Sequence, residues 1–195
     1  MILGITGGTG CGKTTLLETI ENMGGLVLDC DQIYHELLLF DKEMLSAIES
    51  RFPGTVEEGK LNRKKLGSIV FSDEKALLDL NRITHSSVKK EVLRRLEANP
   101  KLAAIDAIGL FEGGLAELCH VTVAVTAPEE IRIKRLMLRD GISAEYAQKR
   151  IHAQHTQDWF REKCDYVLEN NSTKDAFATK CLAFLQNLGI MKEKM

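Results

Sequence analysis

The stretch Ile2-Leu3-Gly4-Ile5-Thr6-Gly7-Gly8-Thr9-Gly10-Cys11-Gly12-Lys13-Thr14 decides the fold of this chain. Its first five residues form a short apolar run that predicts a buried strand, and we expect a helix to begin near Lys13. The residues between them, Gly7 to Thr14, match the pattern G-x-x-x-x-G-K-[ST]. A glycine-rich turn of this kind lets successive backbone N–H groups surround a phosphate beside the positive end of the helix dipole. The stretch therefore predicts a phosphate-binding loop between a strand and a helix.

Two side chains of this loop have chemistry of their own. We expect the Lys13 ammonium to reach the β- and γ-phosphates of a nucleotide, and the Thr14 hydroxyl to ligate the Mg²⁺ that bridges them. The residues predicted to bind ATP here are Gly8, Thr9, Gly10, Cys11, Gly12, Lys13, Thr14 and Thr15.

Five short apolar segments alternate with longer helical patterns along the chain. This alternation predicts an α/β fold of three layers, in which helices cover both faces of a five-stranded parallel sheet, as in the P-loop NTPases. The predicted strands are Ile2 to Thr6, Leu26 to Cys30, Leu102 to Asp106, Val121 to Val125 and Tyr166 to Leu168.

The spacing of the strands predicts an insertion. About seventy residues separate the second strand from the third, whereas one crossover helix needs only a dozen or two. We therefore expect a single domain with a core (1–30, 100–138 and 164–195), a helical insertion (31–99) and a lid around Gly141 (139–163). Two later helices have recognisable ends after the fourth predicted strand: Thr126-x-x-Glu129 predicts a capping box, Gly141 a helix stop and Ser143 a further cap.

Composition limits the class of protein. The chain of 195 residues carries 26 Lys and Arg against 28 Asp and Glu, so its net charge of −2 gives no basic field for nucleic acid or an anionic membrane. The first residues lack a basic segment, and no apolar stretch approaches the ~18 residues of a membrane span. We expect a cytoplasmic monomer or weak homo-oligomer. The five cysteines are scattered and predict free buried thiols, although Cys11 lies in the loop, where a reactive thiol is an alternative.

Carboxylates follow two of the predicted strands. Asp29 and Asp31 end the second strand at the edge where parallel sheets bind ligands. Asp31 is a candidate base that accepts a proton from an attacking hydroxyl, and equally a candidate helix cap. Asp106 ends the third strand and is a candidate for holding Mg²⁺.

Arginines share one face of the helix predicted before Gly141. Arg132, Arg135 and Arg139 are spaced three and four residues apart, and guanidinium groups that close over a transferring phosphate stabilise its charge. Arg139, beside the Gly141 hinge, is the residue we expect to contact ATP and act in catalysis. A solvated helix face is the alternative for any one of them.

The ordered set of motifs resembles the dephospho-coenzyme A kinase family over nearly the whole length of the chain. Besides Thr6 to Thr14 and Asp29-Cys30-Asp31, the matching segments are Leu61-Asn62-Arg63, Ile69 to Asp73, Leu80 to His85, Leu110-Phe111-Glu112, Arg135 to Gly141, Arg150-Ile151 with Gln154, and Asp165 to Asn171. Ser86, Ile108-Gly109 and Phe160 depart from the family pattern.

The resemblance implies transfer of phosphate from ATP, with Mg²⁺, to the ribose 3′-hydroxyl of 3′-dephospho-coenzyme A. It implies that the helical insertion binds the substrate. It also implies that Asp31 is the catalytic base, that the Asn170-Asn171 turn lies near the adenine, with Asn171 as the contact, and that Arg63 and His85 lie on the acceptor side. Two alternatives stay open: another small-metabolite kinase, similar to adenylate or shikimate kinase, and a regulatory module that binds ATP. A GTPase is disfavoured because Thr173-Lys174-Asp175 places its aspartate one position too early for guanine recognition.

Overall fold

The computed structural model describes residues 1–190, and the chain divides into two compact units. The first unit consists of Met1–Leu28, Pro100–Leu110 and the chain from Ala116 onward. The second consists of Asp29–Asn99 and Phe111–Leu115. None of the helices formed by residues 1–190 combines the length and apolar character needed to cross a bilayer.

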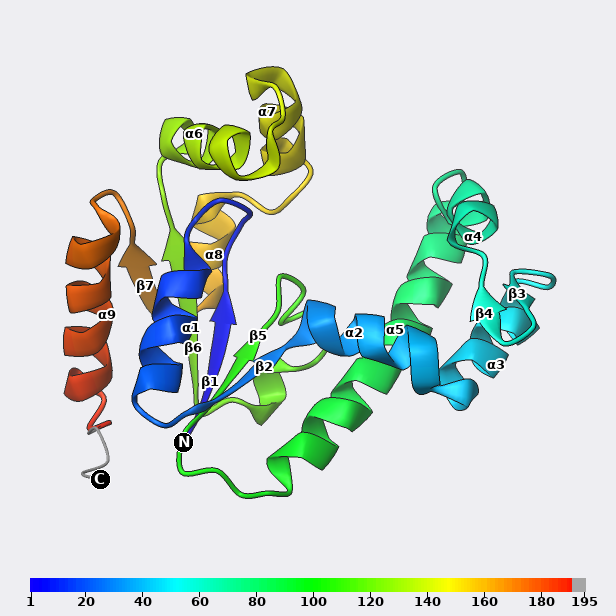
Figure 1. The fold of residues 1–195 in the computed structure, drawn as a ribbon, viewed down its shortest axis with the longest axis horizontal. Coiled ribbons are helices and arrows are strands. Elements are labelled where there is room, and N and C mark those ends of the chain that lie inside the picture. Colours follow the sequence, from blue (N-terminus) through cyan, green and yellow to red (C-terminus); the bar gives the residue numbers. More distant parts are fainter. Residues whose placement is uncertain (191–195) are drawn as a thin grey trace. The chain divides into compact units, whose positions relative to one another are not determined.

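A five-stranded parallel sheet forms the centre of the first unit, as predicted (Figure 1). Its order is β2-β5-β1-β6-β7. The side chains of β1 and β6 that point to either face are buried, which explains why these strands are continuously apolar rather than alternating. The strands are β1 (Ile2–Thr6), β2 (Leu26–Asp29), β5 (Ala103–Asp106), β6 (Val121–Thr126) and β7 (Tyr166–Glu169).

Helices pack on both faces of this sheet. On one face α1 (Lys13–Asn22) and α9 (Lys174–Asn187) lie side by side, and on the other α8 (Gln157–Lys163) packs against β6 and β7 (Figure 1). The expected stripe of α9 is buried against α1 and the sheet through Phe177, Cys181 and Leu185. The loop from β1 to α1 is thereby fixed at both of its ends.

Two further helices of the first unit follow β6. They are α6 (Glu129–Asp140) and α7 (Ala144–His152), and a small core of Leu136, Ala147 and Ile151 joins them. Gly141 ends α6 with a left-handed φ of 66°, and the Ser143 hydroxyl caps α7, both as predicted.

The predicted capping box at Thr126 is wrong. Thr126 is the last residue of β6, paired with Glu169 of β7, and α6 begins only at Glu129, so Thr126 lies two residues before the N-cap. Pro128 occupies the N-cap of α6 without a side-chain hydrogen bond.

The second unit is mostly helical. Its elements are α2 (Cys30–Phe40), α3 (Lys42–Arg51), β3 (Val56–Glu57), β4 (Lys60–Leu61), α4 (Arg63–Val70) and α5 (Glu74–Leu96). Apolar residues at helical spacing form its core, among them Leu38, Met44, Ile48, Phe52, Leu66 and Val70. The hairpin of β3 and β4 was not predicted, because two residues per strand are too few to show an alternating pattern. The short 3₁₀ helix η1 (Ala116–Leu118) belongs to the first unit.

Candidate active site

The phosphate loop of the first unit has the backbone that its glycines permit. Gly7, Gly10 and Gly12 have φ angles of 135°, 78° and 91°, which side chains disfavour. Gly12 is the N-cap of α1 and provides no side-chain hydrogen bond, so the first N–H groups of α1 stay available for an anion. This is the geometry expected of a phosphate-binding loop.

Space as well as backbone angle requires glycine in the loop. A Cβ atom on Gly12 would lie 2.3 Å from the Asn170 side-chain nitrogen, and one on Gly7 would lie 2.2 Å from the carbonyl oxygen of Val125. The loop therefore packs directly on the ends of β6 and β7.

Arginines of α6 hold the carbonyl groups of the loop. Arg132 Nε donates to the Thr9 carbonyl at 2.8 Å, and Arg135 Nη1 donates to the carbonyls of Gly10 and Cys11 at 3.3 and 3.2 Å. These hydrogen bonds fix the carbonyl groups of Thr9, Gly10 and Cys11, and thereby the orientation of the peptides that follow them in the loop.

Asn170 completes this set of contacts from the end of β7. Its Nδ2 donates to the Cys11 carbonyl at 2.9 Å, and its Oδ1 accepts from Arg135 at 3.0 Å. Only 4% of Asn170 is exposed, so its side-chain amide is buried against the loop and holds the loop backbone in place. The sequence placed Arg132, Arg135 and Asn170 in the relevant motifs but did not assign them this function. The spacing of Arg132 and Arg135 indicates a shared helix face, but no local signal in the sequence assigns either of them, or Asn170, to the loop.

The two chemically distinct loop residues lie at the start of α1. Lys13 is half-buried and its Nζ donates to the Gly7 carbonyl at 3.0 Å, which keeps the ammonium beside the loop. The Thr14 side chain is exposed, whereas Thr15 is buried.

Cys11 contributes its backbone to the loop while its thiol is in the core. The residue is 1% exposed and belongs to the cluster that contains Leu16 and Phe177. Burial raises the pKa of the Cys11 thiol, although the nearby cations Arg132 and Lys13 act in the opposite direction. This environment favours the inert thiol over the reactive one.

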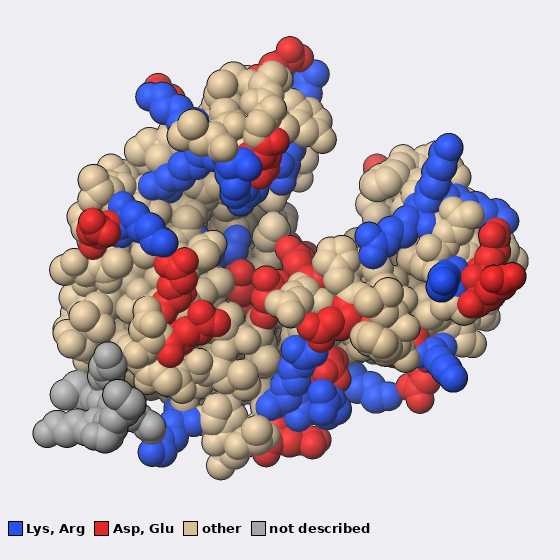
Figure 2. All heavy atoms as spheres, viewed as in Figure 1, with Lys and Arg blue, Asp and Glu red and all other residues tan. Residues whose placement is uncertain are grey.

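Arg139 lies one turn beyond Arg135 on α6 and is bound to a carboxylate. Its Nε donates to Asp140 Oδ1 at 2.6 Å, and Arg150 Nη1 of α7 donates to Asp140 Oδ2 at 2.6 Å. The hydrogen bonds from Arg139 and Arg150 lower the pKa of Asp140 to about 2. Figure 2 shows basic side chains gathered over the α6 and α7 part of the first unit.

A small pocket lies at the carboxyl ends of two strands of the sheet. Its volume is about 130 Å³, and it lies between the ends of β6 and β7 and the helix α8. Asn171 is exposed at its rim. The other lining residues are Thr126, Ala127, Pro128, Gln157, Arg161 and Glu169.

Oxygen donors suited to Mg²⁺ occur at Thr14 and Asp106 of the first unit. Asp106 ends β5 and is half-buried. A hydroxyl and a carboxylate fit Mg²⁺, which usually takes one or two protein oxygens together with phosphate oxygens and water. Residues 1–190 contain no group of three or more His, Cys, Asp and Glu that would hold a metal ion by themselves.

The second unit contains Asp31, in the first turn of α2. The cap of this helix is Asp29, whose Oδ1 accepts the N–H groups of Asp31 and Gln32 at 2.9 and 3.0 Å. The Asp31 side chain is exposed and is not the cap that the sequence allowed it to be.

The other predicted acceptor residues also lie in the second unit. Arg63 begins α4, is exposed, and its Nη2 lies 3.4 Å from Nδ1 of His35 on α2. Lys64 and Lys65 follow it, and Figure 2 shows basic side chains over this helix. His85 is half-buried on α5 and makes no contact with Arg63 that the structure shows as a hydrogen bond or ion pair.

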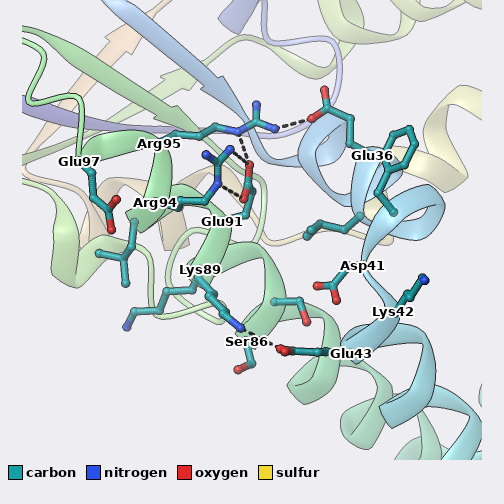
Figure 3. A pocket seen from close by; sticks show the side chains of 15 residues that line it. Glu36, Asp41, Lys42, Glu43, Ser86, Lys89, Glu91, Arg94, Arg95 and Glu97 are labelled. Atoms are coloured by element: carbon teal, nitrogen blue, oxygen red, sulfur yellow. Dashed lines mark hydrogen bonds and ion pairs between the residues drawn. The ribbon is translucent and has the colours of Figure 1, made fainter.

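A groove of about 1060 Å³ runs between α2 and α5 of the second unit (Figure 3). Arg95 bridges these helices, because it binds Glu91 on its own helix at 2.8 Å and Glu36 on α2. The residues that line this groove include none of the predicted acceptor residues Asp31, Arg63 and His85. Several of the charged groups that line the groove pair with one another, Lys90 with Glu43 and both Arg94 and Arg95 with Glu91.

Known proteins that resemble this chain agree with one another. The family model described as dephospho-CoA kinase matches residues 1–175. The dephospho-CoA kinase of Syntrophotalea carbinolica is 34% identical over 194 residues, which are 96% of this chain and 92% of that protein.

Two solved structures resemble the chain over nearly its whole length. The crystal structure of TT1252 from Thermus thermophilus has a TM-score of 0.80 at 32% identity and covers 96% of this chain and 97% of its own. The dephospho-CoA kinase from Campylobacter jejuni has a TM-score of 0.68 at 26% identity, with 97% and 98% covered.

Proposed function

The chain belongs to the dephospho-CoA kinase family, and we propose that Asp31 is the general base of its reaction. The protein phosphorylates dephospho-coenzyme A with ATP, at the ribose 3′-hydroxyl, and produces coenzyme A and ADP. Asp31 accepts the proton of this hydroxyl as its oxygen attacks the γ-phosphorus. The observation that supports this role is the division of labour at the start of α2, where Asp29 caps the helix and Asp31 is left exposed.

The phosphate loop binds the nucleotide in this proposal. The backbone N–H groups of Gly10, Gly12, Lys13 and Thr14 face the phosphates, whereas the Thr9 N–H donates to Gln154. The Lys13 ammonium lies against the β- and γ-phosphates. Phosphoryl transfer depends mainly on positioning and electrostatic stabilisation, so the contacts that hold the loop carbonyls in place support this function.

Thr14 and Asp106 are the residues that would hold Mg²⁺. When bound, this ion neutralises charge on the β- and γ-phosphate oxygens during transfer. The exposed Thr14 hydroxyl at the start of α1 would supply one oxygen to the ion, and the Asp106 carboxylate at the end of β5 would supply another.

The remaining assignments concern the adenine of ATP, the acceptor and the transferred phosphate. Asn171, at the rim of the small pocket, contacts the adenine of ATP. Arg63, within the basic start of α4, and His85 bind the acceptor. Arg139 exchanges its partner Asp140 for phosphate oxygens when ATP is bound, and so stabilises the charge that develops during transfer.

One assay tests the activity and its acceptor together. Purified protein is incubated with Mg-ATP and dephospho-coenzyme A, or with adenosine, AMP or shikimate, and the products are identified by mass. We expect one added phosphate on dephospho-coenzyme A alone. Transfer to one of the other acceptors would support a different small-metabolite kinase, and ATP binding without transfer to any would support a regulatory module.

The Lys13→Ala variant is the control for this assay. It removes the ammonium beside the loop without disturbing a buried core residue, so turnover should fall ~10²-fold or more while the unfolding midpoint stays close to that of the wild type. Unchanged turnover would exclude the assigned role of Lys13.

A further inference from the structure

Both backbone polar groups of Thr9 are held by side chains from outside the phosphate loop. The Thr9 N–H donates to Oε1 of Gln154 at 2.8 Å, and the Thr9 carbonyl accepts from Nε of Arg132 at 2.8 Å. Arg132 Nη2 also lies 3.5 Å from Gln154 Oε1. Gln154 follows α7, so this hydrogen bond joins the loop to the α7–α8 connection within the first unit.

Gly8 makes room for these two side chains. A Cβ atom on Gly8 would lie 2.3 Å from Arg132 Nη2 and 3.1 Å from Gln154 Oε1. The phosphate-loop pattern accepts any residue at this second position, so the pattern by itself does not require glycine there. Glycine at position 8 leaves room for Arg132 and Gln154 to approach the backbone, and a larger residue there would force these side chains to shift.

The contact determines which way one peptide of the loop faces. Because the Gly8–Thr9 peptide directs its N–H to Gln154, it cannot rotate without losing that hydrogen bond in a part-buried place. Arg132 is 3% exposed and holds the next peptide by its carbonyl. The orientation of the first half of the loop is therefore set by these two residues.

We propose that Gln154 is a positioning residue for phosphoryl transfer, which fixes the Gly8–Thr9 peptide through its side-chain carbonyl. The inference rests on the proposed kinase function. The amides at the start of α1 cradle the α- and β-phosphates, whereas Thr9 lies four residues earlier, at the other end of the loop. Gln154 therefore affects the placement of the transferred γ-phosphoryl group more than the binding of the diphosphate.

The Gln154→Met variant tests this inference because methionine has a similar length and cannot accept the Thr9 hydrogen bond. We expect kcat to fall about tenfold or more and the Kd of ATP to rise, while the Kd of ADP and the KM of dephospho-coenzyme A change less than about threefold. Gln148→Met is the matched control, since Gln148 is exposed on α7 and bonds only to Glu129 among the contacts of its side chain shown here.

A second variant distinguishes the position of the side-chain carbonyl from its mere presence. Gln154→Asn keeps the amide but withdraws it by one methylene, so it should lose kcat as Gln154→Met does, with an unfolding midpoint near that of the wild type. Wild-type kcat and ATP affinity in either variant, an equal loss for ATP and ADP, or an equal loss in Gln148→Met would overturn the proposal. The ratio of ATP to ADP affinity needs no acceptor, so it decides this question even if the wild type fails to phosphorylate dephospho-coenzyme A.

Discussion

Asp29 accepts the backbone N–H of Asp31 through Oδ1 at 2.9 Å, and thereby caps the helix on which Asp31 lies. The two carboxylates differ by two positions in the sequence and have different tasks. Asp29 satisfies two N–H groups at the start of α2, which are donors that the helix itself cannot pair. Asp31 lies in the first turn with an exposed side chain, where it is available to an acceptor hydroxyl.

The Asp31→Asn variant should lose turnover ~10²-fold or more, because an amide cannot take the proton of the acceptor hydroxyl. Its unfolding midpoint should remain close to that of the wild type, since the cap is Asp29. Steady-state turnover and thermal unfolding measure the two effects separately. Wild-type turnover in this variant would contradict the assignment of Asp31 as base.

Asp29 provides the matched control for that experiment. Asn caps helices as well as Asp does, so Asp29→Asn should keep both stability and turnover, whereas Asp29→Ala should lose ~1 kcal/mol of stability. If Asp29→Asn lost turnover and Asp31→Asn did not, the two roles would have to be exchanged.

Arg135 should stabilise both the fold and the ATP-binding loop, because it donates hydrogen bonds to two loop carbonyls and to Asn170. In Arg135→Met these acceptors lose their donor, so we expect a loss of ~1–3 kcal/mol in unfolding free energy and weaker ATP binding. Lys134→Met removes an exposed cation of the same helix and should change neither quantity. Calorimetric titration with ATP and chemical unfolding would measure both, and equal effects of the two substitutions would contradict this role.

Much of the core of the first unit could be predicted from the sequence because its signals are local. The glycine pattern from Gly7 to Gly12 and the five apolar strands depend on neighbouring residues, and the structure confirms both. Thr126 shows where local reasoning fails. Its sequence matches the capping-box pattern, but the residue pairs with Glu169 in the sheet and does not cap the helix.

The contacts that shape the site could not be predicted because they join distant segments. Asn170 and Cys11 are 159 residues apart, and Gln154 and Thr9 are 145 apart. Spacing on a helix shows that Arg132, Arg135 and Arg139 share one face, but it cannot tell which of them reaches the loop. Packing of α6 beside the loop brings Arg132 and Arg135 to it, whereas Arg139 pairs with Asp140.

Glu91 gives the stability of the protein a dependence on acid pH. Hydrogen bonds from Arg94 and Arg95 lower the pKa of Glu91 to about 2, from an ordinary value of 4.5. Because the pKa is lower in the folded state, the stabilisation is complete above about pH 4.5 and is lost as the pH falls toward about 2.

We therefore expect Glu91→Gln to be less stable than the wild type at about pH 6 and nearly equal to it at about pH 2.5. Glu145→Gln is the control, because Glu145 belongs to an exposed ion pair with Lys149 and should contribute little at either pH. Urea unfolding at both pH values measures the difference. A constant gap between Glu91→Gln and the wild type would show that its ion pairs do not set the acid dependence.

Cys11 should resist alkylation although it lies in the phosphate loop. The thiolate is the reactive form, and burial both raises the pKa of the Cys11 thiol and removes it from contact with solvent. Folded protein treated with iodoacetamide at about pH 7.5 should carry no label on Cys11, whereas urea-unfolded protein should be labelled there. Mass spectrometry of peptides locates the label, and the same digest reports Cys119, whose pKa is raised to about 12 by burial and which we also expect to react slowly. Rapid labelling of Cys11 in the folded state, blocked by ATP, would show instead that the loop opens far enough to expose the thiol.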